Sequence, residues 1–315
     1  MRATIRQILW LIVALILNST TLAESTRVAT YNLHNYLVMD RHVSGVWRPA
    51  YPKPEGEKAI LRQVIVATNP DVLALQELGG APFLQELRAD LALDGVDYPY
   101  AIHMCGADGA RHLGVLSKLP PIEVVKHQDL NFNYLSHRES VRRGMLEVSF
   151  LRSHGALWKL FVVHLKSRWS DEPADPKCQL RRTLEAEACR NRIIERTIAV
   201  GVTDYLIAGD FNDHPASAPM RRFYRRGGLV LGALLPVWDS RQEQWTCFYP
   251  KQSLYSRVDG FVISTGLSAA VEAGHGSIVD IPDALLGSDH RMVYVDLSLS
   301  LTQKATVLPK SAALK

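Results

Sequence analysis

An Asp and an Asn follow a short apolar run at Asp210 and Asn212, where their side chains could carry out hydrolytic chemistry. Residues 205–208 are predicted to form a buried strand that Gly209 ends. Because side chains alternate along a strand, Asp210 and Asn212 point the same way if the chain stays extended. A carboxylate beside a neutral amide can hold a water and a phosphate oxygen together. An Asx-rich turn that closes a strand is the alternative for this motif taken alone.

Other side chains that can bind metals or move protons also lie at the ends of apolar runs. Each alone has an ordinary structural explanation, such as a turn cap for Asn32 or an ion pair with Arg257 for Asp259. Together they indicate an active site, because active sites collect where a rigid scaffold aims side chains. These residues are Asn32, Glu77, His164, Asp259, Asp289 and His290.

Apolar and alternating runs predict the strands that must position these side chains, and helical periodicity predicts helices between them. Strands are expected at residues 27–33, 72–76, 113–117, 145–151, 157–165, 205–208, 258–263 and 292–297. Helices are expected at residues 56–68, 82–93, 179–200 and 218–225. Several strands follow one another with only a turn between them. This favours a mixed sheet or a pair of sheets over a purely parallel doubly wound sheet.

The start of the chain is typical of a secretory signal peptide. Arg2 and Arg6 precede an apolar run at residues 8–17, and small residues precede Glu24, the expected first residue after cleavage. A membrane-anchored start is the alternative, but a span needs about 20 apolar residues. We therefore expect a signal peptide at residues 1–23, one α/β domain at residues 24–300 and a loosely held tail at residues 301–315.

Charge and cysteine content narrow the classes of function. After cleavage, 34 basic residues face 32 acidic ones, which excludes a strongly cationic nucleic-acid-binding protein. Four cysteines in an exported chain suggest disulfides, and Cys178–Cys189 is the preferred pair. Buried free thiols are the alternative.

Seven motifs together resemble the endonuclease/exonuclease/phosphatase superfamily. This group contains deoxyribonuclease I, exonuclease III-type repair endonucleases, neutral sphingomyelinases and inositol polyphosphate 5-phosphatases. The motifs follow the family's order across residues 27–299, and the resemblance implies a four-layer α/β sandwich of two packed mixed sheets flanked by helices. They are Tyr31-Asn32, Leu75-Gln76-Glu77, Gly114-Val115-Leu116-Ser117-Lys118, His164-Leu165-Lys166-Ser167, Gly209-Asp210-Phe211-Asn212-Asp213, Arg257-Val258-Asp259-Gly260 and Ser288-Asp289-His290.

Hydrolysis of a phosphate ester requires charge on the phosphoryl group to be neutralised, and a hard divalent cation with oxygen ligands can do this. We expect Mg²⁺, with Mn²⁺ or Ca²⁺ as alternatives. Glu77 is the first expected ligand, with Asn32 beside it and Asp289 as a further ligand. The resemblance carries these roles over position by position.

The remaining matched residues have expected catalytic roles. Asp210 would orient and deprotonate the attacking water, and Asn212 would hold a phosphate oxygen. His290, oriented by Asp259, would donate a hydrogen bond to the phosphate or act as a general acid–base. His164 would be the second histidine, near the leaving group. Exonuclease III-type members tend to hold a tyrosine there, so His164 favours the other branches.

Basic residues near these motifs are candidates for substrate contact, although surface solubility explains each equally well. They are Arg111, Arg143, Lys166 and Arg168, with His112 as a further candidate. Residues 221–226 form a basic and aromatic run that can follow a nucleic-acid backbone or form a solvated helix face with Phe223 packed inward. Residues 245–249 resemble a segment that packs near the site in related proteins, and we expect them in the core.

We expect an exported, metal-dependent phosphoesterase, most simply a nuclease that cuts DNA or RNA. The alternatives are a phosphatase or a sphingomyelinase-like lipid phosphodiesterase, and a catalytically inactive binding module. No hydrophobic hairpin suited to membrane insertion is evident in the sequence, which disfavours the lipid alternative. We expect nucleic acid as the substrate, no stable membrane partner after cleavage, a monomer, and a location in the periplasm or the medium.

Overall fold

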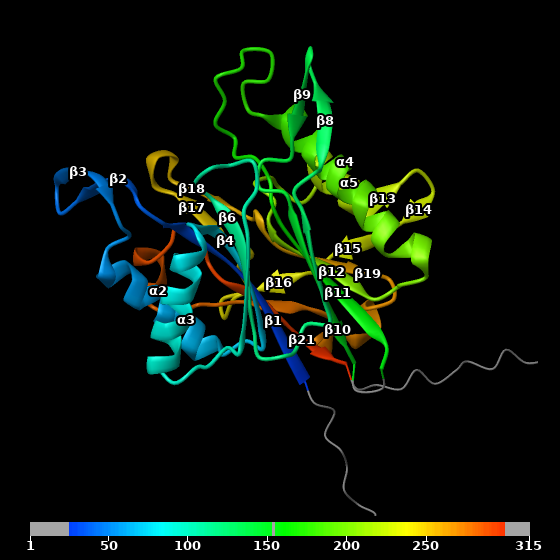
Figure 1. Cartoon of the computed structure of the whole chain (residues 1–315), viewed down its shortest axis with the longest axis horizontal. Helices are drawn as coiled ribbons and strands as arrows, with labels where there is room; N and C mark the ends of the chain where they lie inside the picture. Colours follow the sequence, from blue (N-terminus) through cyan, green and yellow to red (C-terminus); the bar gives the residue numbers. More distant parts are fainter. Residues whose placement is uncertain (1–24, 153–154, 300–315) are drawn as a thin grey trace, which may run out of the picture.

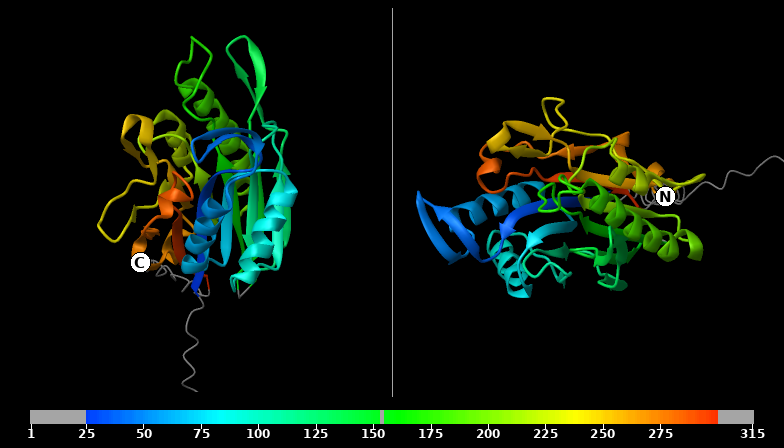
Figure 2. Two further views of the ribbon diagram at one scale, coloured as in Figure 1. Left: turned by 90° about the vertical axis from the view of Figure 1, so that its left-hand side faces the viewer. Right: turned by 90° about the horizontal axis from the view of Figure 1, so that it is seen from above.

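Two β-sheets packed face to face form the centre of the molecule in the computed structural model, which describes residues 25–152 and 155–299 (Figure 1). Helices lie on the two outer sides of the sheet pair (Figures 1 and 2). This arrangement confirms the predicted four-layer α/β sandwich. The predicted signal peptide at residues 1–23 and the tail at residues 301–315 lie outside the described residues.

The first sheet has seven strands, and β1 lies near its middle. β1 pairs in parallel with β4 and antiparallel with β21, so the sheet is mixed as expected. In spatial order the strands are β16 (Val237–Trp238), β20 (Gly276–Ile278), β21 (Val293–Ser298), β1 (Ser25–Tyr36), β4 (Val72–Leu78), β6 (His112–Ser117) and β5 (Tyr100–Met104).

The second sheet has six strands, and β12 lies near its middle. β12 is parallel to β11 and antiparallel to β19. In spatial order the strands are β15 (Gly232–Leu234), β19 (Asp259–Ser264), β12 (Tyr205–Asp210), β11 (Leu157–His164), β10 (Met145–Leu151) and β7 (Glu123–His127).

In the described part of the chain, four two-stranded hairpins and five 3-10 turns lie outside the two large sheets. The hairpins are β2 (Met39–Val43) with β3 (Val46–Tyr51), β8 (Asn131–Tyr134) with β9 (His137–Ser140), β13 (Arg225–Arg226) with β14 (Leu229–Val230), and β17 (Cys247–Tyr249) with β18 (Leu254–Ser256). The turns are η1 (Ile198–Val200), η2 (Pro250–Gln252), η3 (Ser268–Ala270), η4 (Glu272–Gly274) and η5 (Ala284–Leu286). Of these hairpins and turns, the sequence patterns predicted only η1, as the end of a longer helix.

The four α-helices within residues 25–152 and 155–299 lie close to their predicted positions. They are α2 (Glu55–Thr68), α3 (Ala81–Leu93), α4 (Gln179–Arg196) and α5 (Ala218–Tyr224). In α2, Leu61, Val64, Ile65 and Thr68 recur at helical spacing and are buried, so one face of the helix packs against the sheet. Asn69 ends α2 in the left-handed conformation, and its N–H donates to the carbonyl of Ile65. Among the described residues, no helix is both long enough and apolar enough to cross a bilayer.

Three apolar clusters hold the layers together. One lies between the sheets, a second joins the first sheet to α2 and α3, and a third joins the second sheet to α4 and α5. Along β1, Val28 belongs to the cluster between the sheets, whereas Ala29 and Tyr31 belong to the cluster beneath the helices. This alternation follows from the two-residue repeat of a strand. Both sheets are rigid as a result, and they can fix side chains that lie at their edges.

Candidate active site

Three adjacent strands of the second sheet bring His164, Asp210 and Asp259 side by side. The register pairs His164, the last residue of β11, with Asp210, the last residue of β12. It also pairs Asp210 with Asp259, the first residue of β19. All three side chains are buried. The sheet therefore places an imidazole and two carboxylates together, shielded from water.

Gly209 allows β12 to pass close to β11 just before Asp210. Its φ is +148°, and a Cβ built there would lie 1.9 Å from the carbonyl oxygen of Val163. Any other residue would force the two strands apart. Gly209 therefore does not end the strand, as the sequence suggested, but forms part of it.

The carboxylate of Asp210 accepts hydrogen bonds from two asparagines. Its Oδ1 accepts from the backbone N–H of Asn212 at 2.8 Å. Its Oδ2 accepts from Nδ2 of Asn32 at 3.0 Å and from Nδ2 of Asn212 at 3.1 Å. Asn212 has a φ of +52°, so the chain is not extended as predicted and a left-handed turn brings the amide back to Asp210.

Burial and neighbouring charges shift the pKa values of Asp210 and His290. Burial, followed by the charge of Asp259, raises the pKa of Asp210 to about 7. Burial alone would lower the pKa of His290, but the charges of Asp259 and Asp210 outweigh burial and raise that pKa well above its ordinary value. Nδ1 of His290 donates to Asp259 at 2.8 Å, and its Nε2 lies 3.9 Å from Oδ2 of Asp210. A charged imidazole donor therefore lies beside a carboxyl group suited to accept a proton near neutral pH.

His164 is a neutral histidine in the same cluster. Burial, with the positive charge of Arg143, holds the pKa of His164 well below its ordinary value. Its Nε2 lies 3.4 Å from Oδ2 of Asp210 and 3.9 Å from Oε1 of Glu77. Within the described part of the chain, its buried Nδ1 has no hydrogen-bond partner. His164 thus lies between the carboxylate of Asp210 in the second sheet and the carboxylate of Glu77 in the first sheet.

The first sheet supplies oxygen atoms that suit a hard divalent cation. Oε2 of Glu77 accepts from the backbone N–H of Asn35 at 2.9 Å. Oδ1 of Asn35 and Oδ1 of Asp289 are buried without hydrogen-bond partners in residues 25–152 and 155–299. All three residues line one cleft. The donor set fits Mg²⁺ or a similar cation, because such ions prefer carboxylate and amide oxygens.

Asn32, an expected metal ligand, does not line the cleft that contains Glu77 and Asp289. It is fully buried, its Nδ2 donates to Asp210, and its Oδ1 accepts from the backbone N–H of His34. It does not contribute to the lining of the cleft, whereas Asn35, three residues later, does. The sequence signal for Asn35 was its position just beyond the Tyr31-Asn32 motif.

Among the residues that the structure describes, two groups of side chains are close enough to share an ion, and both contain His290. Asp210, Asp259 and His290 form one group, and Cys247, Asp289 and His290 form the other. In the first group the hydrogen bond between His290 and Asp259 already occupies the atoms that would bind a metal. We therefore regard this group as an acid–base cluster, distinct from the oxygen atoms around Glu77.

The cleft over these side chains has a volume of about 510 Å³ and a basic wall. Of the four expected substrate-contact residues, Arg111, Arg143 and Lys166 line it. Arg168 does not line it and lies 3.9 Å from Asp213 instead. Nη2 of Arg143 lies 3.1 Å from Asp108, while its buried Nε and Nη1 lack hydrogen-bond partners among the described residues. Sequence reasoning assigned no role to the lining residues His34, Asn35, Asp108, Arg142, Ser167 and Trp169.

Two predictions about neighbouring segments need correction. Tyr249 lines the cleft, so residues 245–249 pack near the site as the resemblance implies, but Tyr249 does not lie in the core. Cys178 and Cys189 are buried free thiols, and the four cysteines form no disulfide in the part of the chain that the structure describes. Cys178 precedes α4 and Cys189 lies three turns into it. A helix rises about 1.5 Å per residue, so the pair is too far apart for a bond.

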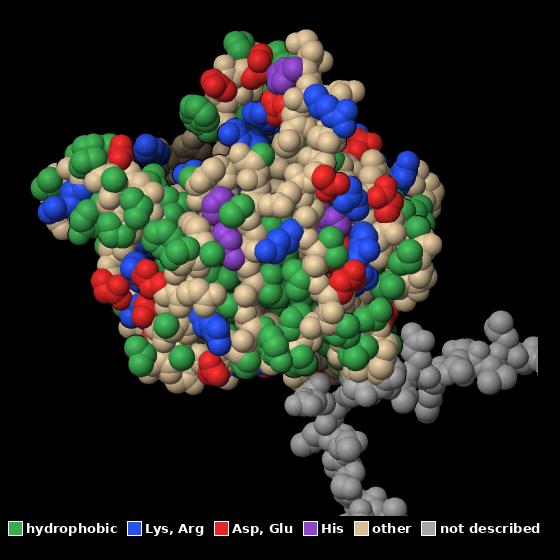
Figure 3. Space-filling view, viewed as in Figure 1, with side chains coloured by type: hydrophobic (Ala, Val, Ile, Leu, Met, Phe, Trp, Pro, Cys, Tyr) green, Lys and Arg blue, Asp and Glu red, His purple; other side chains and the backbone are tan. Residues whose placement is uncertain are grey.

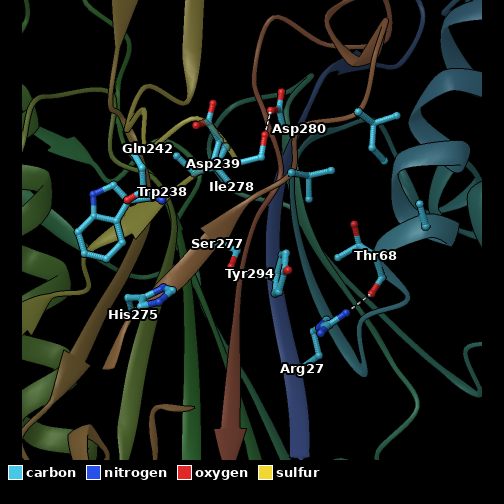
Figure 4. Close-up of a pocket in the computed structure, with 14 residues that line it drawn as sticks. Arg27, Thr68, Trp238, Asp239, Gln242, His275, Ser277, Ile278, Asp280 and Tyr294 are labelled. Atoms are coloured by element: carbon cyan, nitrogen blue, oxygen red, sulfur yellow. Dashed lines mark hydrogen bonds between the residues drawn. The ribbon is translucent and has the colours of Figure 1, made fainter. Parts of the chain in front are cut away.

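A second cavity, of about 590 Å³, lies on the first sheet beside α2 and shares no lining residue with the cleft (Figure 4). Its polar groups are largely paired with each other. Arg27 donates to Asp296 and to the carbonyl of Thr68, and Ser240 donates to Asp280. Among the described residues, it therefore has no cluster comparable to that around Asp210.

Solved structures with the same fold include enzymes with different named activities. Sphingomyelinase C from Streptomyces griseocarneus is 18% identical, with 87% of this chain and 99% of that chain covered and a TM-score of 0.58. The human Nocturnin catalytic domain with bound sulfate is 14% identical, with 86% and 93% covered and a TM-score of 0.57. A Bacteroides vulgatus endonuclease/exonuclease/phosphatase is 17% identical, with 87% and 98% covered and a TM-score of 0.58. At these identities the likeness shows the fold alone.

The sequence itself carries the family signature. No curated protein matches the chain. A profile described as the endonuclease/exonuclease/phosphatase family matches residues 29–290, which include the acid–base cluster and the oxygen atoms around Glu77. The chain therefore belongs to the endonuclease/exonuclease/phosphatase family of phosphoester hydrolases.

Proposed function

We propose that this protein is an exported, divalent-metal-dependent nuclease that hydrolyses phosphodiester bonds. The observation that carries the proposal is the basic wall of the cleft, in which Arg111, Arg142, Arg143 and Lys166 lie around the acid–base cluster. A polyanion gains from each cation that contacts a phosphate, so a wall with four basic side chains favours a phosphodiester polymer over a small phosphate ester. The predicted signal peptide supports export.

The side chains suggest how the reaction would proceed. Asp210 takes a proton from a water that attacks the phosphorus, since its pKa lies near neutrality. His290, held by Asp259, donates a hydrogen bond to a phosphoryl oxygen and stabilises the growing negative charge. Asn212 keeps Asp210 oriented through its hydrogen bond, and His164 would be the second histidine, near the leaving group or the scissile phosphate.

A hard divalent cation would be held by Glu77 together with Asn35 and Asp289, which differs from the expected set by replacing Asn32 with Asn35. When bound, such an ion neutralises charge on the phosphoryl oxygens. Asn32 acts instead through its hydrogen bond to Asp210.

A lipid phosphodiesterase is the second candidate, because the β2–β3 hairpin exposes apolar side chains. Val46 and Trp47 are 53% and 56% exposed. Arg41 of the hairpin donates to the carbonyls of Asn35 and Leu37, which ties it to the cleft. No hydrophobic hairpin was predicted from the sequence, and one of the structural neighbours is named a sphingomyelinase. Arg41, His42 and Arg48 on the same hairpin suit nucleic acid equally well.

The test compares both substrates with one protein. Purified residues 24–315 are incubated with supercoiled plasmid and with sphingomyelin vesicles, each with Mg²⁺, Mn²⁺ or EDTA. The Asp210→Ala variant is the inactive control, and His214→Ala, at an exposed residue, is the matched control. We expect nicking of plasmid that needs metal, disappears in Asp210→Ala and persists in His214→Ala. Intact plasmid with cleaved sphingomyelin would replace the nuclease by the lipid phosphodiesterase.

A further inference from the structure

Three cations of the basic wall lie on two segments that leave neighbouring strands of the second sheet. Arg142 and Arg143 come just before β10, and Lys166 comes just after β11. The two strands pair antiparallel up to Met145 and Val163. Figure 3 shows Lys and Arg side chains beside the hollow between the β2–β3 and β8–β9 hairpins, which Figure 1 labels in the same view. Whatever fixes these two segments therefore fixes where the cations lie.

The two segments do not continue the pairing of their strands. Carried three residues beyond Met145 and Val163, the register would set Arg142 opposite Lys166. Instead, a turn precedes β10, in which the N–H of Gly144 donates to the carbonyl of Val141 at 3.0 Å. The N–H groups of Arg142 and Lys166 are therefore left without a strand partner, although buried N–H groups need an acceptor.

Glu185 of α4 supplies an acceptor for both segments. Its Oε1 accepts from the backbone N–H of Arg142 at 3.0 Å, and its Oε2 accepts from the backbone N–H of Lys166 at 2.7 Å. Arg182, which precedes Glu185 on the helix by one turn, donates from Nη1 to the carbonyl of Lys166 at 3.2 Å. Arg182 also donates from Nε and Nη2 to Asp213 at 3.1 Å. Two side chains of α4 thus hold both backbone groups of Lys166.

Stability alone does not explain a carboxylate at this position. Glu185 is fully buried, and burial raises its pKa even though two N–H groups donate to it. Glu147, a buried carboxylate of β10, differs. Burial acts on it in the same direction, but hydrogen bonds from basic side chains outweigh burial and lower its pKa to about 2. Folding therefore favours the charge of Glu147 and opposes that of Glu185, so the two backbone groups that Glu185 holds are the better explanation of its place.

We propose that Glu185 is a positioning residue for substrate binding, which holds the backbone of Arg142 and Lys166 so that the basic wall faces bound phosphates. The inference rests on the proposed nuclease function and adds to it a residue outside the cleft. Glu185 does not line the cleft, so it acts through the wall and not by touching the substrate. Arg143 is the side chain that would carry the effect. It follows Arg142 directly, and its Nε and Nη1 have no partners among the described residues.

Steady-state kinetics of Glu185→Gln in purified residues 24–315 test the proposal. Glutamine has the same size but only one acceptor oxygen for the two N–H groups, so one segment loses its anchor. On a fluorescent oligonucleotide with Mg²⁺, we expect KM to rise about tenfold while kcat stays within about twofold, the pattern for lost binding and intact chemistry. The slope of log KM against log salt should fall by about one phosphate contact. Glu147→Gln, the same substitution at a buried carboxylate of β10, is the matched control and should leave KM unchanged.

Amide hydrogen exchange measures the positioning without reference to activity. Exchange at residues 141–144 and 165–167 should become faster in Glu185→Gln. Glu147→Gln should leave these amides unchanged, because segments outside the strands exchange by local opening. Glu185→Asp keeps both acceptor oxygens on a shorter side chain, so it should change KM and exchange less than Glu185→Gln does. Circular dichroism verifies that each variant is folded.

A double variant shows whether Glu185 acts through Arg143. In an Arg143→Gln background, Glu185→Gln should change KM by less than about twofold, because the effects of residues that share one contact do not add. Equal KM values for the wild type and Glu185→Gln, or fully additive effects in the double variant, would overturn this role while leaving the nuclease proposal intact. A wild-type protein that cleaves neither oligonucleotide nor plasmid would overturn the nuclease proposal and this role together.

Discussion

Nε2 of His164 lies 3.4 Å from Oδ2 of Asp210, and the two residues are register partners on the parallel strands β11 and β12. The same oxygen of Asp210 lies 3.9 Å from Nε2 of His290. One carboxylate oxygen thus faces a neutral imidazole and a charged one. This asymmetry gives the two histidines different tasks, because only the charged ring can donate from both nitrogens.

Replacement of Asp210 by Asn should lower kcat/KM by about 10²–10⁴, the range for a positioned acid–base group. The substitution keeps the side-chain volume and removes the proton acceptor. The rate is measured on a fluorescent oligonucleotide or, if the substrate is lipid, on sphingomyelin, with circular dichroism as the check on folding. His214→Ala serves as the control. Activity of Asp210→Asn within a few-fold of the wild type would remove this residue from the mechanism.

Replacement of Asp259 by Asn should shift the whole pH–rate profile to lower pH. The negative charge of Asp259 raises the pKa of Asp210 and that of His290. Without this charge, Asp210 loses its proton at lower pH, so the acid limb of the profile shifts to lower pH. His290 also loses its proton at lower pH, so the alkaline limb shifts to lower pH as well. Initial rates from pH 5 to 10 measure both limbs, and an unmoved alkaline limb would show that His290 does not act as a cation.

The long buried elements were predictable because their patterns are repetitive. Residues 205–208 of β12 are apolar at every position because the strand is covered on both faces, and α2 carries its buried residues at helical spacing. The β2–β3 hairpin lacks both signals. Its strands mix Arg, His, Trp and Pro, and the turn is formed by Ser44 and Gly45, both with positive φ. Such a turn is a weak signal when the flanking strands are exposed.

The members of the site were more predictable than their contacts. Asp210, Asp259 and His290 were identifiable because each closes or opens an apolar run. Their hydrogen bonds depend on strand register, which pairs residues far apart in the chain. The extended path assumed for Asn212 failed because a left-handed residue reverses the chain there. Asn35 was missed for a similar reason, since it lies at φ +60° just after a left-handed His34.

Replacement of Arg143 by Gln should raise KM about 10–100-fold, because hydrogen bonds to charged groups contribute roughly 1.5–3 kcal/mol. Arg143 lines the cleft, and its Nε and Nη1 have no partners in the described residues, so both are available to a phosphate. Arg168→Gln is the matched control, because Arg168 does not line the cleft. Steady-state kinetics at two salt concentrations separate the effects on KM and kcat. Equal KM values for the two variants would contradict a phosphate contact by Arg143.

Replacement of Glu147 by Gln should destabilise the protein more at neutral pH than in acid. Burial alone would raise the pKa of Glu147, but hydrogen bonds from His127, Arg196 and Lys159 outweigh it and lower the pKa to about 2. A carboxyl group whose pKa is depressed on folding contributes stability above its unfolded pKa of about 4.5, and that stability is lost as pH falls toward 2. The side chain is fully buried, so the contribution at pH 7 is on the order of 3 kcal/mol.

Urea denaturation at pH 7 and at pH 3 measures this contribution as the difference between the wild type and Glu147→Gln, which cancels the titration of other carboxylates. We expect a difference of about 2–4 kcal/mol at pH 7, since removal of one partner leaves buried cations unpaired. It should shrink as pH falls, because protonation weakens the same contacts in the wild type. Asp97→Asn, at an exposed carboxylate, is the control and should change neither value. A difference that stays constant between the two pH values would mean that packing, and not the charge of Glu147, stabilises the junction of β10 with α4.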